Sequence, residues 1–126
     1  MKKGLIILGK QGSGKSLMAV KTALEYDIET VATIDGRQFS DKKFSRNYLV
    51  SCLNKNTKVL VIDDLLIDVD WDNIFALFGS FSIGQTCKKP VNISLTKIIV
   101  VCSETFLIEN VPITSSFRRR FLVIQL

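Results

Sequence analysis

A glycine-rich segment near the start of the chain places a lysine and a serine where they could bind the phosphates of a nucleotide. Residues 9–16 read GKQGSGKS and match G-x-x-x-x-G-K-[ST] at every fixed position. Glycines let such a loop wrap tightly, so that backbone N–H groups reach phosphate oxygens. We expect Lys15 to contact the β- and γ-phosphates of ATP and the Ser16 hydroxyl to bind Mg²⁺. The predicted nucleotide-binding residues are Gly9, Lys10, Gln11, Gly12, Ser13, Gly14, Lys15, Ser16 and Leu17.

The segments on either side of this loop have the pattern that a phosphate-binding loop requires. Residues 3–8 form a short apolar run typical of a buried strand, and helical spacing follows, with Leu17, Val20 and Leu24 on one face. This order places the partial positive charge of a helix N-terminus behind the phosphates. The alternative is a glycine-rich turn that binds no ligand. In that case all the fixed residues of the motif would have to match it by chance.

Two adjacent carboxylates follow a second buried run. Residues 59–62 read VLVI, and Asp63 and Asp64 come directly after them. In a parallel sheet, ligands lie at the carboxyl ends of the strands, so Asp63 is expected beside the phosphate loop. We expect Asp63 to bind Mg²⁺, directly or through water, and Asp64 to orient or deprotonate the attacking water. The alternative is a pair of loop carboxylates that caps the next segment.

Two later segments carry groups that could act on the γ-phosphate. Ser103 follows the apolar run 98–101, at the same predicted edge of the sheet, and could contact the γ-phosphate or the attacking water. Alternatively, the strand simply enters a loop there. Residues 118–120 are three arginines, and one of them could supply positive charge to the γ-phosphate transition state of a neighbouring subunit. A basic surface turn or a contact with nucleic-acid phosphates is the alternative.

Apolar runs that alternate with helical patterns predict an α/β fold. The helical patterns cover residues 44–53 and 71–81, with Asp70 as the N-cap of the second, and residues 36–43 are polar and loop-like. Runs that are apolar on both faces indicate a mainly parallel sheet covered on both sides, which is a three-layer sandwich. The five predicted strands span residues 3–8, 30–34, 59–62, 98–101 and 121–126.

One stretch departs from this alternation. Residues 91–96 alternate apolar and polar side chains, and the segment from Phe81 to Cys87 can pair against them. We predict a β-hairpin inserted before the strand at 98–101, with Lys88 and Lys89 near its tip.

Composition narrows the possible functions. The 126 residues predict a single domain, 1–126, and the net charge of +5 suits an acidic partner such as nucleic acid. The absence of histidine excludes Ser-His-Asp and Cys-His catalysis and any histidine-bound metal. The three cysteines lack C-x-x-C spacing and predict free thiols in a reducing compartment. No stretch approaches the roughly 20 apolar residues of a membrane span, so we expect a cytoplasmic protein that does not bind membranes.

Together these motifs resemble the core of superfamily 3 helicases within the AAA+ P-loop NTPases. The order matches throughout: a Walker A motif, the acidic pair Asp63–Asp64, a basic hairpin, a sensor strand and an arginine before the last strand. The resemblance implies an ATPase, a helicase-like or translocase-like motor that uses ATP and Mg²⁺ in the replication of a virus or mobile element. It implies that Lys88 and Lys89 touch single- or double-stranded nucleic acid, and that Arg120 is the arginine finger.

The resemblance also implies an assembly. Proteins of this type form a homo-oligomeric ring or bind a partner replication protein, in the bacterial or host cytosol or in the nucleus. The family's sensor strand usually ends in Asn, where this chain has Ser103 or Glu104. Neither an oligomerisation segment nor a helical lid accompanies the core, so we expect either part of a larger system or a minimal ATPase.

Three other functions share the phosphate loop. A small nucleotide kinase needs a lid and an acceptor pocket, and it leaves the hairpin unexplained. A phage assembly ATPase begins with a similar glycine-rich segment but carries a membrane span. A nucleotide-binding adaptor binds without hydrolysis. Stimulation of ATP hydrolysis by single-stranded DNA distinguishes a nucleic-acid motor from all three.

Overall fold

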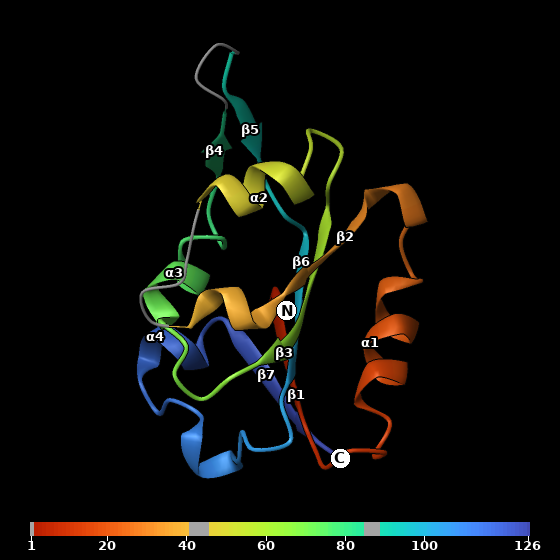
Figure 1. Ribbon diagram of the computed structural model, residues 1–126, viewed down its shortest axis with the longest axis vertical. Helices are drawn as coiled ribbons and strands as arrows, with labels where there is room; N and C mark the ends of the chain where they lie inside the picture. Colours follow the sequence, from red (N-terminus) through yellow and green to blue (C-terminus); the bar gives the residue numbers. More distant parts are fainter. Residues whose placement is uncertain (1, 41–45, 85–88) are drawn as a thin grey trace.

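A five-stranded parallel sheet forms the centre of the computed structural model, which describes residues 2–40, 46–84 and 89–126. The strand order is β2-β3-β6-β1-β7, and every neighbouring pair is parallel (Figure 1). All five strands predicted from the sequence are confirmed. They are β1 (Gly4–Leu8), β2 (Val31–Asp35), β3 (Val59–Leu65), β6 (Lys97–Cys102) and β7 (Phe121–Gln125).

The strands are in a register that brings their carboxyl ends to one edge of the sheet. Ile7 of β1 pairs with Val101 of β6 on one side and with Ile124 of β7 on the other. Asp35, at the end of β2, pairs with Asp63 of β3. The loop after β1, the acidic pair in the last part of β3 and the segment after β6 therefore lie side by side.

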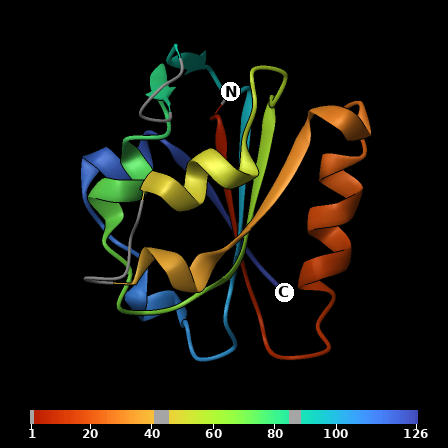
Figure 2. The same ribbon diagram turned by 45° about the horizontal axis from the view of Figure 1, so that its top comes forward.

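Helices cover both faces of the sheet, as predicted. Helix α1 (Lys15–Ala23) lies on one face, and the other elements cover the opposite face (Figure 2). These are the 3₁₀ helix η2 (Gly36–Phe39) and the helices α2 (Arg46–Cys52), α3 (Trp71–Phe75) and α4 (Ser115–Arg118). The larger hydrophobic core lies under this second layer, where fully buried Phe39, Phe106 and Phe117 pack against the sheet.

Helix α1 contacts the sheet through its small residues. Ala19 and Ala23 are buried against β1, β3 and β6. Leu17, Val20 and Leu24 share a face, as the spacing predicted, but that face is 59%, 52% and 62% exposed. Alanines let the helix approach the sheet closely, and the large apolar side chains remain more than half exposed.

The predicted hairpin is present. Strands β4 (Phe81–Ile83) and β5 (Val91–Ile93) pair antiparallel, with Phe81 opposite Ile93. Ile83 and Ile93 are buried, while Ser82 and Asn92 face outward and share a hydrogen bond of 2.8 Å. The hairpin lies at the end of the molecule opposite the loop between β1 and α1 (Figure 1).

Some predicted bounds differ from those observed. The helix predicted over residues 71–81 ends at Phe75, because a turn and Gly79 follow before β4 begins. Its predicted N-cap is confirmed, since the Asp70 carboxylate accepts a hydrogen bond of 3.1 Å from the Asp72 N–H. The segment expected to be a loop after β2 contains η2, whose Phe39 is fully buried.

Candidate nucleotide-binding site

The glycine-rich loop joins β1 to α1 in the left-handed backbone conformations that its sequence requires. Gly12 and Gly14 have φ values of 81° and 95°, which favour glycine because a Cβ atom makes them strained. No atom lies within 4 Å of the position where either Cβ would be, so the requirement for glycine comes from the backbone conformation and not from crowding. The Lys15 ammonium donates a hydrogen bond of 2.6 Å to the Gly9 carbonyl and so lies folded across the loop.

Two further observations concern the packing of Gly9 and Ser13 within this loop. A Cβ atom on Gly9 would lie 2.5 Å from the Ser13 hydroxyl oxygen, so the tight wrap depends on glycine there. Within the described part of the chain, the Ser13 hydroxyl is the buried side-chain polar group that has no hydrogen-bond partner.

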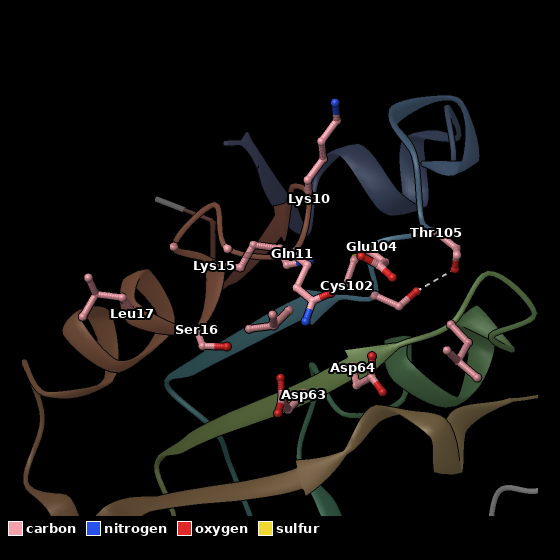
Figure 3. A pocket seen from close by; sticks show the side chains of 15 residues that line it. Lys10, Gln11, Lys15, Ser16, Leu17, Asp63, Asp64, Cys102, Glu104 and Thr105 are labelled. Carbon is pink, nitrogen blue, oxygen red and sulfur yellow. Dashed lines mark hydrogen bonds between the residues drawn. The ribbon is translucent and has the colours of Figure 1, made fainter.

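The loop forms one wall of a cavity of about 830 Å³ at the carboxyl edge of the sheet. This volume is within the range of small-molecule sites. The other walls are the ends of β3 and β6 (Figure 3). The sequence-predicted residues that line it are Lys10, Gln11, Gly12, Gly14, Lys15, Ser16, Leu17, Asp63, Asp64 and Ser103.

Two oxygen groups in this cavity fit a magnesium ion. The Ser16 hydroxyl and the Asp63 carboxylate point into the same part of the cavity from α1 and β3 (Figure 3). Both side chains belong to exposed residues, so they are accessible to an ion that arrives with its own water ligands. Magnesium prefers such oxygen ligands and keeps several waters. The donor set therefore fits the predicted ion.

Asp64 has an unusual backbone conformation. Its φ of 66° is the only positive value of a non-glycine residue in the described part of the chain. The register of β3 against β6 shifts between Asp63 and Leu65, so Asp64 forms a bulge. Strained residues of this kind cluster at functional sites. The bulge turns the Asp64 side chain toward the open cavity (Figure 3).

The end of β2 adds residues that the sequence did not reveal. Arg37 lies 3.9 Å from an Asp64 carboxylate oxygen and forms a 2.9 Å ion pair with Asp35. Hydrogen bonds from the Arg37 side chain hold the pKa of Asp35 below its usual value, so Asp35 stays ionised. Nothing in the local sequence marks this pair; only the pairing of β2 with β3 brings it to Asp64.

The segment after β6 closes the far side of the cavity. Ser103 is 9% exposed, and its hydroxyl lies 3.0 Å from that of Thr105, so the two share a hydrogen bond (Figure 3). Glu104 and Thr105 also line the cavity, and the sequence had singled out neither as a binding residue. Burial raises the pKa of the neighbouring Cys102 thiol to about 12, partly offset by Lys15. The Cys102 thiol is therefore uncharged at pH 7 and forms part of the cavity wall.

Arg120 lies far from the cavity of its own chain. It precedes β7, whose first residue pairs with Gly4 at the start of β1, whereas the phosphate loop follows the end of β1. A strand of this length spans about 16 Å. The guanidinium donates a hydrogen bond of 2.8 Å to the Ser116 carbonyl and lies 4.8 Å from the centre of the Phe75 ring. Any role of Arg120 at a phosphate therefore concerns another subunit.

The predicted nucleic-acid contacts are only partly described. Lys89 is exposed at the start of the segment that leads into β5. Lys88 and the rest of the hairpin tip lie outside the described residues. The hairpin lies at the end of the molecule opposite the loop between β1 and α1 (Figure 1), and that loop lines the cavity, so a contact at the hairpin does not compete with a nucleotide for space.

Comparisons with known proteins show the fold. No protein-family model matches the chain, and no curated protein matches it. Two solved structures of longer chains are similar over 98% of this chain: the apo C-terminal region of NrS-1, with 22% identity and a TM-score of 0.60, and a mutant RuvB from Thermotoga maritima, with 18% identity and a TM-score of 0.56.

These similarities confirm the predicted α/β P-loop NTPase fold. The assignment to the AAA+ proteins remains a prediction. The narrower resemblance to superfamily 3 remains a prediction. The chain spans 29% of the length of the NrS-1 structure and 38% of the RuvB structure. No helix in the described residues is both long and apolar enough to cross a membrane.

Proposed function

We propose that this protein is a Mg²⁺-dependent ATPase whose hydrolysis drives a helicase-like or translocase-like action on nucleic acid. One observation carries the proposal: Lys15 and Ser16 of the glycine-rich loop line the same cavity as Asp63 and Asp64. A cation, a hydroxyl and two carboxylates are the groups that phosphoryl transfer to water needs. They come from separate elements that only the folded sheet brings together.

Nucleotide titration tests the binding step. Lys15→Ala removes the ammonium folded across the loop. Charge-assisted hydrogen bonds contribute about 1.5–3 kcal/mol, which corresponds to roughly 10-fold to 150-fold weaker binding. The matched control is Lys21→Ala, the same charge change at an exposed position in the last turn of α1, and it should bind a fluorescent ATP analogue like the wild type. Equal affinities of Lys15→Ala and the wild type would refute the proposed site.

The action on nucleic acid is supported by charge and by the hairpin. The chain carries a net charge of +5, and the hairpin presents Lys89 away from the nucleotide cavity. Lys88 and Lys89 should contact phosphates without reading bases. Removing both with Lys88→Ala/Lys89→Ala should flatten the dependence of log K on log[salt] by about 0.7 for each contact with single-stranded DNA.

Hydrolysis separates this proposal from its rivals. Single-stranded DNA should raise the ATPase rate of the wild type, and the Lys88→Ala/Lys89→Ala variant should lose the stimulation while keeping its nucleotide affinity. A nucleotide kinase would transfer phosphate to an acceptor instead, and an adaptor would bind ATP without turnover. If the protein neither hydrolyses ATP nor binds DNA at low salt, the proposed motor function is wrong. Only the nucleotide-binding part of the proposal then remains.

An arginine from a second subunit would complete the site. Arg120 is held by Ser116 and the Phe75 ring, whereas Arg118 and Arg119 are exposed on the same segment. The contacts of Arg120 inside its own chain favour Arg118 or Arg119 for a role in trans.

A further inference from the structure

Strand β7 forms one edge of the sheet and pairs only with β1. The Arg120 carbonyl accepts a hydrogen bond of 2.8 Å from the Gly4 N–H, so the backbone of Arg120 faces β1. Because successive residues of a strand direct their backbone groups to opposite sides, Phe121, Val123 and Gln125 direct theirs away from β1, toward the open edge. Within the described part of the chain, none of these groups has a hydrogen-bond partner.

Strand β7 lacks the features that normally protect a sheet edge. Such edges carry prolines, charged side chains or bulges that prevent a further strand from pairing. Residues 121–125 read FLVIQ, with neither a proline nor a charge, and their register against β1 is regular. At the opposite edge, the Val31 N–H of β2 donates to the Ile28 carbonyl. The Asp35 N–H of the same strand donates to the Tyr48 hydroxyl, so β7 is the more open of the two edges.

An apolar groove of about 310 Å³ lies along this edge. Leu122 and Val123 line it from β7, and Leu122 is 54% exposed. Ile108 and Ile113 line it from the segment between β6 and β7, and they are 48% and 80% exposed. Exposed apolar side chains that gather beside a groove mark an interaction site. A strand added to β7 would cover these side chains while its backbone pairs with that of β7.

Positive charge gathers at the start of β7. Lys2 and Arg118 line the groove, and exposed Arg119 follows in the chain. Glu109 is the only carboxylate side chain among residues 105–126. Charges of one sign around an apolar groove select a partner of the opposite sign. A second copy does not meet this requirement with its own β7, because that strand carries no charged side chain.

We propose that β7 accepts an extended, acidic segment of a partner protein as an additional strand at its open edge. The segment has apolar side chains at alternate positions, which fill the groove, and carboxylates at the end that lies beside Lys2 and Arg118. Backbone hydrogen bonds give such a contact its affinity, and the groove and the cations give it specificity. Nucleic acid fits the cations, but it leaves the apolar groove and the row of backbone groups unused. The contact does not depend on ATP hydrolysis.

Amide hydrogen exchange followed by NMR tests the open edge in the protein alone. The N–H groups of Leu122 and Ile124, which face β1, should exchange at least about tenfold more slowly than those of Val123 and Gln125. Equal protection of all four groups in dilute protein would show that the edge is already covered, and it would overturn the proposal. Protection that appears only as the protein concentration rises would identify a second copy as the occupant, and it would overturn the proposal as well.

Synthetic peptides of about eight residues supply the acidic strand. One version begins with a pair of glutamates followed by alternating valine and threonine, and a second carries the glutamates at its other end, so that both strand directions are tested. One version should bind saturably in fluorescence anisotropy, and it should slow the exchange of the Val123 and Gln125 amides at least about tenfold. Binding by neither version overturns the proposal.

N-methylation of alternate peptide amides distinguishes an added strand from attraction by charge alone. Methyl groups on the amides that face β7 should weaken binding at least about tenfold, because they remove the donors of the backbone ladder. Methyl groups on the other set of amides should leave binding nearly unchanged. Equal responses to the two sets overturn the proposal.

Charge reversal tests the chemistry of the partner. Lys2→Glu/Arg118→Glu should weaken peptide binding at least about tenfold, and replacing the peptide glutamates with lysines should restore it at low salt. The matched control, Lys21→Glu/Lys55→Glu, makes the same charge change at exposed positions outside the groove and should bind the peptide like the wild type. Displacement of the peptide by single-stranded oligothymidine of similar length would overturn the proposal in favour of a phosphate site. The peptide should bind equally with and without ATP, so a failure of peptide binding and a failure of nucleotide binding are separate results.

Discussion

Gly36 packs directly against the backbone of Asp64. A Cβ atom on Gly36 would lie 2.9 Å from the Asp64 carbonyl carbon, 2.8 Å from the Asp63 carbonyl oxygen and 2.7 Å from the Leu65 nitrogen. Asp64 itself has a φ of 66° at the bulge of β3. The end of β2 therefore lies against the strained turn that aims a carboxylate at the nucleotide cavity, and glycine is what permits this approach.

Gly36→Ala should disturb the bulge and the reaction together. The methyl group must push β2 and β3 apart, and overpacking of this kind costs about 1–3 kcal/mol in the free energy of unfolding. We expect that loss in urea titrations, together with a larger decrease in kcat than in nucleotide affinity. Gly79→Ala is the control, because no atom lies within 4 Å of its Cβ position. Wild-type stability of Gly36→Ala would show that the bulge is not packed this tightly.

The two carboxylates near the end of β3 should have separable roles. Asp64→Asn is the informative change, because asparagine also tolerates a positive φ and so keeps the backbone of the bulge. It should retain nucleotide affinity and lose about 10²–10⁴ in kcat, the contribution typical of a general base. Asp63→Asn should instead weaken the Mg²⁺-dependent part of nucleotide binding. Turnover of Asp64→Asn at the wild-type rate would contradict the assignment of Asp64.

The parts of this fold that the sequence predicts are those that depend on local pattern. Residues 59–62 are apolar on both faces because their strand is buried on both faces, and the loop at residues 9–16 is defined by fixed spacing. The parallel sheet then places Asp63 beside that loop. Each of these inferences uses only the residues that are adjacent in the sequence, or the general rule that parallel strands end at the same edge of a sheet.

The parts that the sequence does not predict depend on contacts between distant segments. Arg37 reaches Asp64 only because β2 pairs with β3. The spacing of Leu17, Val20 and Leu24 shows that they share a face, but periodicity does not tell which face of a helix meets the sheet. Here alanines take the inner position, and the large side chains are exposed.

Cys102 should make the protein less stable in alkali. Burial raises its pKa from the ordinary 9.0 of a thiol to about 12. Between these values the unfolded chain releases the thiol proton and the folded chain keeps it, so the free energy of unfolding falls as pH rises. One proton gives a slope of at most about 1.4 kcal/mol per pH unit. Urea titrations from pH 8 to 10.5 should show a flatter decline for Cys102→Ala than for the wild type; parallel curves would contradict the shift.

Arg120 should matter more to stability than its two exposed neighbours. Its guanidinium donates a hydrogen bond to the Ser116 carbonyl and lies over the Phe75 ring, beside a cluster in which the Phe117 and Phe121 rings stack 4.8 Å apart. A charge-assisted hydrogen bond and a cation–π contact together contribute about 2 kcal/mol. Arg120→Ala should lower the free energy of unfolding by about this amount, whereas Arg119→Ala, at an exposed site, should change it by less than about 0.5 kcal/mol.

Activity measurements on Arg120→Ala distinguish a structural role of this arginine from a role as an arginine finger. If Arg120 only holds α4 and α3 together, hydrolysis by Arg120→Ala should fall in step with the folded fraction and recover at lower temperature. If Arg120 is the finger predicted from the sequence, kcat should collapse in fully folded protein, and mixing Arg120→Ala with Lys15→Ala subunits should restore activity at the interfaces that contain both intact residues. The contacts of Arg120 within its own chain favour the first result, and they make Arg118→Ala and Arg119→Ala the variants in which complementation with Lys15→Ala is expected.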